Sequence, residues 1–184
     1  MNKNLLILGA GQYGQVAKEI AEAMGCFEKI DFLDDGKEFA VGKLSSYKDF
    51  LNSYSYAIVA IGNPDVRMDW INKLENIGYR IAHIIHPKAY VSPSAQIMKG
   101  SIIEPMAVVN TECVISRGCI ISAGAIINHN SICSEGVHVD CNASVPGNSK
   151  IPEKTKVTCG TVYRSIVHTP TKTNDIKYNF ECGM

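Results

Sequence analysis

Residues 109–132 read VNTECV ISRGCI ISAGAI INHNSI, and each group of six begins with Val or Ile and has Ala, Ser or Cys at its fifth position. The same period of six runs without a break from residue 85 to residue 162, which makes thirteen hexads. Position one is Ile or Val in every hexad except the one that begins at Cys133. A repeat of this length indicates a solenoid, in which each unit buries its apolar side against its neighbours.

A large aliphatic and a small residue at fixed offsets suit a short strand that turns a corner every six residues. The aliphatic side chain points into a narrow core, and the small one relieves crowding. The pattern resembles the hexapeptide-repeat proteins, in which three hexads form one triangular coil of a left-handed parallel β-helix. The resemblance alone implies the left hand, because crossovers between parallel strands are generally right-handed. We expect residues eighteen apart to stack in adjacent coils at the spacing of paired strands.

The N-terminal half has a different period, in which short apolar runs alternate with helical spacing. We expect strands at residues 5–10, 29–35, 56–62 and 79–85, and helices at residues 12–24 and 65–76. This alternation predicts a parallel sheet with helical crossovers. The sequence therefore predicts an α/β Rossmann-like domain over residues 1–84, a left-handed β-helix over residues 85–162 and a C-terminal tail over residues 163–184.

Charge and hydropathy exclude several classes of function. The chain of 184 residues has 18 basic and 18 acidic residues, and these are interspersed. No basic patch for nucleic acid or for an anionic membrane is therefore expected. The apolar run at the N-terminus is too short for a signal peptide, and none approaches the length of a membrane span. We expect a cytoplasmic protein with no nucleic-acid partner and no membrane insertion.

The seven cysteines form no CxxC pair, and most lie in ordinary strand-like segments. We interpret them as reduced and buried small apolar residues, because free cysteine is among the most buried residue types. A zinc site is the alternative. We predict no metal ligands.

The sequence GAGQYG at residues 9–14 follows a strand and opens a helix, which is the context in which GxGxxG binds phosphate. Asp34 stands twenty residues beyond Gly14, where a ribose-binding acid stands in an NAD site. An NAD-dependent oxidoreductase is therefore one interpretation. An α/β unit of this size has no second half for a nicotinamide, however, and a glycine turn that binds nothing is a further alternative.

Two histidines, His129 and His138, lie nine residues apart in the hexad array. His129 occupies position three of its hexad, near a corner where side chains face outward, and the period places Gly147 directly beside it. His138 is half a coil further on and is not expected to touch His129 of the same chain. If both serve one site, two subunits must supply it. The alternative is that both are surface or structural histidines.

Together the two halves resemble the sugar O-acyltransferase family, which includes the UDP-4-amino-sugar N-acetyltransferases and the sialic-acid O-acetyltransferase-like proteins. The resemblance rests on GAGQYG, FLDD at residues 32–35, AIGNPDVR at residues 60–67, IIHPKAYVSPSA at residues 84–95, and the INH and VHV segments. It implies a homotrimer that takes acetyl-CoA and a nucleotide-linked amino sugar as substrates. By position it implies a diphosphate site at Gly11, Gln12, Tyr13 and Gly14, a nucleoside site at Asp34 and Asp35, and completion of that pocket by Gly62, Asn63 and Arg67.

The resemblance also implies that His129 is the catalytic base and that His138 contacts acetyl-CoA. Asn130 stands where relatives often have an acid, and we expect it to orient the His129 ring. The Gly147 amide is the candidate donor to the oxyanion, and Cys159, stacked beside Cys141, is expected to line the CoA cleft. Acetylation of an amino group is the primary hypothesis and O-acetylation remains open. The alternative function is a non-catalytic sugar-nucleotide-binding or scaffold trimer that has lost CoA binding.

Overall fold

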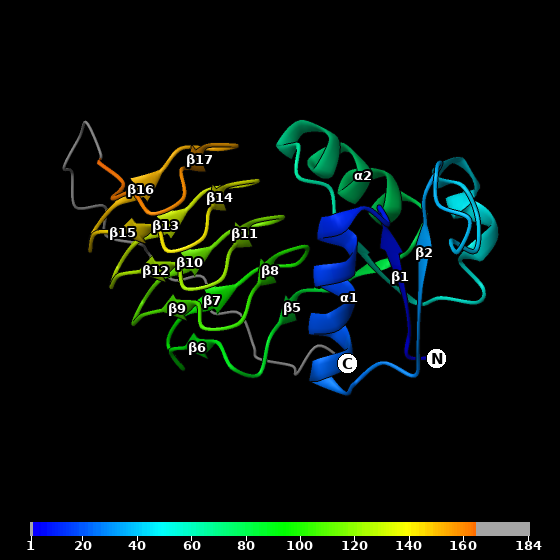
Figure 1. The fold of residues 1–184 in the computed structure, drawn as a ribbon, viewed down its shortest axis with the longest axis horizontal. Helices are drawn as coiled ribbons and strands as arrows, with labels where there is room; N and C mark the ends of the chain where they lie inside the picture. The colour runs from blue at the N-terminus through cyan, green and yellow to red at the C-terminus, as the bar shows by residue number, and fades with distance from the viewer. Residues whose placement is uncertain (1, 165–184) are drawn as a thin grey trace.

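The computed structural model describes residues 2–164 and has two parts, an α/β domain and a stack of short strands (Figure 1). The first part contains a parallel sheet in the order β2-β1-β3-β4. Its elements are β1 (Asn4–Leu8), α1 (Gln12–Met24), β2 (Lys29–Leu33), the 3-10 helix η1 (Leu44–Phe50), β3 (Tyr56–Val59), α2 (Pro64–Asn76) and β4 (Arg80–Ile81). The predicted Rossmann-like unit is thus confirmed, and α1 has the bounds that its helical spacing predicts.

Local sequence explains where the two helices begin and end. Asn63 caps α2 by accepting the Val66 N–H at 3.1 Å, and Pro64 takes the first position of the helix, where no N–H is needed. Gly25 ends α1 in the left-handed conformation, with φ of 64°. Helix α1 contacts β1 and β2 on one side and β5 on the other, so it lies between the two parts of the molecule (Figure 1).

Residues 84–163 form a parallel β-helix, as the hexads predict, and it is left-handed, as the family resemblance implies. Three parallel sheets have the orders β16-β13-β10-β7, β17-β14-β11-β8-β5 and β15-β12-β9-β6. Partners lie eighteen residues apart, as in the pairing of His138 with Ile120 and with Lys156. The strands are β5 (Ile84–Ile85), β6 (Tyr90–Val91), β7 (Gln96–Ile97), β8 (Ile102–Ile103), β9 (Val108–Val109), β10 (Val114–Ile115), β11 (Ile120–Ile121), β12 (Ile126–Ile127), β13 (Ile132–Cys133), β14 (His138–Val139), β15 (Ser144–Val145), β16 (Lys150–Ile151) and β17 (Lys156–Val157).

Position four of the hexad is the corner residue. From residue 100 to residue 160 every residue at this position has a positive φ, whether it is Gly, Asn, Met, Glu or Lys. Glycine and asparagine adopt this conformation most easily, which explains why they hold eight of these eleven positions. The corners set the direction of the side chains that flank them, including the one at His129.

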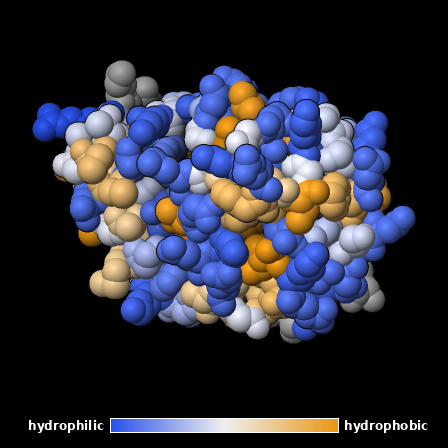
Figure 2. Space-filling view, turned by 45° about the vertical axis from the view of Figure 1, so that its right-hand side comes forward, coloured by the Kyte–Doolittle hydropathy of each residue, from blue (hydrophilic) through white to orange (hydrophobic). Residues whose placement is uncertain are grey.

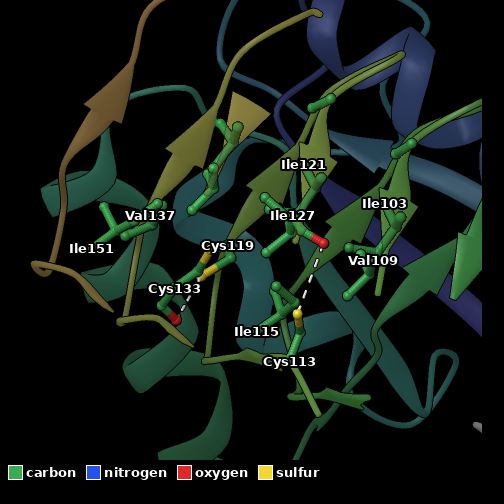
Figure 3. Packing of buried hydrophobic residues seen from close by; sticks show 14 of the residues in the cluster. Ile103, Val109, Cys113, Ile115, Cys119, Ile121, Ile127, Cys133, Val137 and Ile151 are labelled. Atoms are coloured by element: carbon green, nitrogen blue, oxygen red, sulfur yellow. Dashed lines mark hydrogen bonds between the residues drawn. The ribbon is translucent and has the colours of Figure 1, made fainter. Parts of the chain in front are cut away.

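The core of the β-helix is a column of residues from positions one and five (Figure 3). Cys113, Cys119 and Cys133 are fully buried with free thiols, as predicted. The Cys113 thiol donates to the Asn128 carbonyl at 3.0 Å, and burial raises the pKa of Cys119 to about 12. Cys159 is exposed and Cys141 is only half-buried, so the expectation of burial is wrong for Cys159 and holds only in part for Cys141. Both stand near corners and not in the core.

The predicted single strand at residues 79–85 is wrong. The segment forms β4, which pairs with β3, and then β5, which pairs with β8 of the β-helix. The boundary between the domains therefore precedes Ile84 and does not follow it. One end of the segment YRIAHII is covered by the α/β domain and the other by the β-helix, so the segment is mostly apolar throughout. Its hydropathy therefore does not reveal the break between β4 and β5.

The C-terminal end of the β-helix continues slightly past the predicted boundary. Val162 bridges to Ser144, and the Tyr163 N–H donates to the Ser144 carbonyl at 2.8 Å. Most of the predicted tail, residues 165–184, lies outside the described residues. On the face shown in Figure 2, hydrophilic and hydrophobic residues are interspersed. Within residues 2–164 no helix is long and apolar enough to cross a membrane.

Candidate active site

The glycine-rich turn between β1 and α1 is built by glycines with different tasks. Gly9 has a φ of 97°, and a Cβ at Gly14 would lie 2.2 Å from the Gly9 carbonyl oxygen. These two glycines are therefore required by the turn itself. A Cβ at Gly11 would meet nothing within 4 Å. Gly11 is thus the glycine whose missing side chain leaves room for a ligand at the start of α1.

A cavity of about 540 Å³ opens beside this turn, and its lining includes Gly11, Gln12, Lys18, Lys37 and Phe39. Lys18 and Lys37 supply positive charge against one acid of the lining, Asp31, and Phe39 is 59% exposed and packs edge-on against Phe32. A cation pair and an exposed aromatic ring at a helix N-terminus suit a phosphorylated nucleoside.

Asp34 and Asp35 lie at the end of β2, along a second hollow of about 320 Å³. Asp34 accepts the Ala10 N–H at 2.7 Å and the Gly36 N–H at 2.9 Å, which holds the pKa of its carboxyl below the usual value. Asp35 accepts the Leu44 N–H at 3.0 Å. Asp34 therefore ties the glycine turn to the loop after β2. Both acids border this hollow, and their contact with a nucleoside, which the resemblance implies, stays a prediction.

Arg67 does not complete this pocket, which corrects one predicted substrate residue. Its side chain is fully buried between the domains. The guanidinium donates at 2.8 Å to four backbone carbonyls, those of Ile61, Gly62, Gly118 and Gly136. The last two belong to the β-helix, so Arg67 joins the domains. The other predicted pocket residues of this segment are also engaged locally, because Asn63 caps α2 and the Gly62 carbonyl accepts from Arg67.

Tyr13 is the other residue that the structure places away from the predicted diphosphate site. Its hydroxyl is buried and makes no hydrogen bond of standard geometry with a described residue. Burial and the nearby Glu104 carboxylate raise the pKa of the Tyr13 hydroxyl well above its usual value. Tyr13 thus points from the glycine turn into the junction between the domains, toward the β-helix.

His129 stands at the corner between β12 and β13 and is exposed, as predicted. Its imidazole lies against Gly147, where a Cβ would be 2.7 Å from both Cε1 and Nε2. The Asn130 side-chain amide nitrogen lies 3.2 Å from His129 Nδ1. The two neighbours in sequence meet because Asn130 is a corner residue with a φ of 55°. The stacking of Gly147 and the contact with Asn130 therefore both follow from the hexad geometry.

An open backbone donor accompanies this histidine. The Gly147 N–H makes no hydrogen bond to any residue within 2–164, whereas the next N–H, that of Asn148, donates to the His129 carbonyl at 2.9 Å. An imidazole and a free amide that share one corner are the two groups that acyl transfer needs, a base and a donor for the developing oxyanion.

His138 is held differently. It lies in β14, in another sheet from the corner of His129, and no contact joins the two histidines within the described part of the chain. Its Nε2 is 3.0 Å from Ser122 Oγ and 3.9 Å from Asp140 Oδ1. Burial lowers the pKa of His138 to about 4, so the ring is neutral near neutral pH. Whether a second subunit brings His138 to His129 stays a prediction.

Sequence reasoning missed the polar column beside His138. Glu104, Ser122 and Asp140 occupy position two of hexads eighteen residues apart, so the period that stacks Gly147 on His129 also stacks these three. Asp140 accepts from Lys156 Nζ at 2.9 Å. Cys141, the neighbour of Cys159 in the stack, is half-buried near this column. Within residues 2–164 no group of three His, Cys, Asp or Glu side chains is placed to hold a metal ion.

A Rossmann-like domain joined to a left-handed β-helix, with a histidine and a free glycine amide at one corner, defines a hexapeptide-repeat acyltransferase. Comparisons with known proteins lead to one family. The model of the PglD N-terminal domain matches residues 4–74. The acetyltransferase domain of PglB from Neisseria gonorrhoeae is 32% identical, with a TM-score of 0.84 over 89% of this chain and 83% of that one. The same domain in complex with acetyl coenzyme A is 33% identical, with a TM-score of 0.82 and the same coverage.

A more distant match is PerB from Caulobacter crescentus, in complex with CoA and GDP-perosamine. It is 19% identical, with a TM-score of 0.58 over 86% of this chain and 90% of that one, and this likeness supports the fold alone. The identity and coverage of the PglB domain show the family. The protein belongs to the PglB- and PglD-like sugar acetyltransferases of the hexapeptide-repeat class.

Proposed function

We propose that the protein transfers the acetyl group of acetyl-CoA to the amino group of a nucleotide-linked 4-amino sugar, within the synthesis of sugars for glycoproteins or surface glycans. The observation that carries this proposal is the corner at which the His129 imidazole lies against Gly147, whose N–H is free. The relatives add support, because the PglB acetyltransferase domain has been solved with acetyl coenzyme A.

In this reaction the amino group of the sugar attacks the thioester carbonyl carbon. The sugar amine attacks in its neutral form, because an ammonium has no lone pair. As the N–C bond forms, its nitrogen must lose a proton, and His129 as a neutral imidazole takes it. The Asn130 side chain, 3.2 Å from Nδ1, orients the ring when its amide is turned so that the oxygen accepts from Nδ1–H, and Nε2 then has the free lone pair that meets the substrate. Negative charge develops on the thioester oxygen, where the Gly147 N–H donates. The C–S bond then breaks, and the proton held by His129 passes to the departing thiolate.

The nucleotide belongs at the glycine turn. Its diphosphate meets the first N–H groups of α1 at Gly11 and Gln12, and its nucleoside meets the hollows lined by Phe39, Asp34 and Asp35. His138 contacts the pantetheine arm of acetyl-CoA, and Cys159, which is exposed, borders the same cleft. The cysteines have no catalytic part, because no covalent intermediate is needed. Acetyl-CoA and nucleotide sugars are cytoplasmic metabolites, so we place the protein in the cytoplasm.

A homotrimer completes the site in this proposal. On the outer face of the sheet β15-β12-β9-β6, Tyr90, Val108 and Ile126 stack in one apolar column, and Tyr90 and Ile126 are 55% and 43% exposed. The column ends beside the corner of His129, because Ile126 begins the strand that precedes it. Packing of this face against the next subunit would bring a neighbouring β-helix, with its own His138, to His129.

A thiol-release assay over UDP- and TDP-linked amino sugars tests the proposal, with calorimetric binding of each ligand alone. Release of CoA that depends on one amino sugar, with acetylation at nitrogen shown by mass spectrometry, is the expected result. Binding of a nucleotide sugar with no binding of acetyl-CoA would instead identify a scaffold protein. Binding of NAD alone would identify an oxidoreductase, and acetylation at oxygen would overturn the choice of the amino group.

A further inference from the structure

Glu104 is a buried acid that the reaction above does not use. Only 8% of the residue is exposed, and no Lys or Arg forms an ion pair with it among residues 2–164. A buried carboxylate without a cation is unfavourable unless hydrogen bonds hold it. Its Oε2 accepts the Ala123 N–H at 3.0 Å. The carboxylate lies at the domain junction, where the Tyr13 hydroxyl faces it from helix α1.

Ser122 lies between Glu104 and His138. It is 3% exposed, its Oγ is 3.0 Å from His138 Nε2, and it stacks beside Glu104, because the residues that precede the two, Ile121 and Ile103, are paired in adjacent coils. In this place its hydroxyl stabilises the Glu104 carboxylate. A serine hydroxyl has one proton to donate. If that proton is directed at the carboxylate, which only accepts while ionised, the oxygen must accept the hydrogen bond from His138. The proton of the neutral imidazole then lies on Nε2.

We propose that Glu104, acting through Ser122, holds His138 as its Nε2–H tautomer and leaves Nδ1 as a hydrogen-bond acceptor for a ligand. Glu104 and Ser122 are positioning residues for His138. The ligand group that meets Nδ1 must then be a donor, such as an amide N–H. The pantetheine arm of acetyl-CoA carries such groups, and this identification of the ligand rests on the proposed function, whereas the tautomer does not.

The other charged groups around His138 either favour the Nε2–H tautomer as well or do not affect the choice of tautomer. Asp140 Oδ1 is 3.9 Å from Nε2 and favours a proton on that nitrogen. Lys156 pairs with Asp140 from the next coil, and the positive charges of Lys156 and Arg67 both disfavour imidazolium. From α1, Tyr13 faces Glu104 and not His138. The ring therefore remains neutral, and its tautomer is decided by Ser122 and the acid behind it.

Glu104→Gln tests the relay with little change of shape. The side-chain carbonyl of the variant can still accept from Ala123, while its amide donates to Ser122 Oγ, which then turns its own proton toward His138 Nε2. In ligand-free protein labelled with ¹⁵N-histidine, long-range ¹H–¹⁵N spectra distinguish the two tautomers. We expect Nε2–H in the wild type and a shift toward Nδ1–H in the E104Q variant. An Nδ1–H signal in the wild type, or an unchanged tautomer in the variant, would overturn the proposal.

Kinetics provide a second measurement. Loss of one ligand hydrogen bond predicts a rise of about five- to tenfold in KM for acetyl-CoA in E104Q, with a smaller change in kcat. Ser122→Ala should raise KM similarly, and Ser116→Ala, at position two of the preceding hexad, should leave it unchanged. A fall in kcat without any change in KM would assign Glu104 to another role. If no acetyl transfer is found at all, the spectra still decide the tautomer.

Discussion

The imidazole of His129 lies against Gly147, the residue one coil further along the β-helix. A Cβ at residue 147 would lie 2.7 Å from both Cε1 and Nε2 of the ring. Because Gly147 does not have a left-handed backbone, the absence of a side chain there serves the histidine and not the turn. The position of the proposed base and of its neighbouring amide thus depends on one missing methyl group.

Gly147→Ala should therefore lower turnover without unfolding the protein. The new methyl group forces the ring to tilt away from the Gly147 N–H, and a displacement of about 1 Å at a reacting group lowers rates about a hundredfold. Thermal unfolding and kcat measured on the same preparation check this. Glu153→Ala, another exposed position-three residue, is the matched control. Full activity in Gly147→Ala would show that the His129 ring can shift without loss of function, which would contradict this prediction.

Gly11→Val should weaken binding of the nucleotide sugar and leave acetyl-CoA binding unchanged. A Cβ at Gly11 meets nothing within 4 Å in the free protein, so the new side chain is expected to obstruct a ligand at the N-terminus of α1. Calorimetric titrations with each ligand measure the two affinities. Gly14→Ala is the contrasting variant, because its Cβ would lie 2.2 Å from the Gly9 carbonyl oxygen and should destabilise the whole domain. Equal losses for both ligands in Gly11→Val would indicate misfolding.

Arg67→Met should loosen the attachment of the two domains. The change leaves four carbonyl groups without their donor. Those of Gly118 and Gly136 are in buried hydrogen bonds, and each buried unsatisfied group costs about 1–3 kcal/mol. We expect a loss of more than about 3 kcal/mol in the free energy of unfolding, measured by urea denaturation. Arg67→Lys should recover only part of it, because an ammonium cannot reach all four carbonyls. If Arg67→Met kept wild-type stability but lost nucleotide binding, Arg67 would instead be a residue of the substrate pocket.

The sequence predicts the parts of the fold that repeat. The period of six specifies strands, stacking and the neighbours of His129, because each coil contacts only the coils beside it. It also held signals that were missed, since Gly and Asn at position four mark the corners, and Glu104, Ser122 and Asp140 lie eighteen residues apart.

Contacts between the domains could not be predicted in this way. Tyr13 and Arg67 lie in segments typical of a nucleotide pocket, and only the packing of α1 and α2 against the β-helix turns their side chains into the junction. The break between β4 and β5 has the same origin, because residues covered by two different domains are as apolar as a single buried strand.

The neutral form of His138 predicts that stability depends on pH. In the unfolded chain histidine has a pKa of about 6.5, and in the folded protein that of His138 is lowered to about 4. Between these values the unfolded chain binds a proton that the folded protein does not, so stability falls as pH drops from about 6.5 to about 4. His138→Gln should reduce this slope in urea titrations. His83, whose pKa burial also lowers, provides a comparison variant, and an unchanged slope for His138→Gln would contradict the assignment.

The last prediction concerns the base itself. His129→Ala should lower kcat by about 10²- to 10⁴-fold, as expected for a lost general base, with little change in the affinity for either substrate.

Asn130→Asp or Asn130→Glu places an acid beside Nδ1, where the amide nitrogen now lies at 3.2 Å. A carboxylate stabilises imidazolium more than a neutral amide does. The acidic limb of kcat/KM against pH should therefore move upward, and the rate above that limb should rise. Asn128→Asp is the control, because Asn128 contacts the backbone N–H of His129 and not the ring. Wild-type turnover in His129→Ala would remove the catalytic assignment. A silent change at Asn130 alone would leave His129 as the base and would show that another group, from a neighbouring subunit or from the substrate, orients its ring.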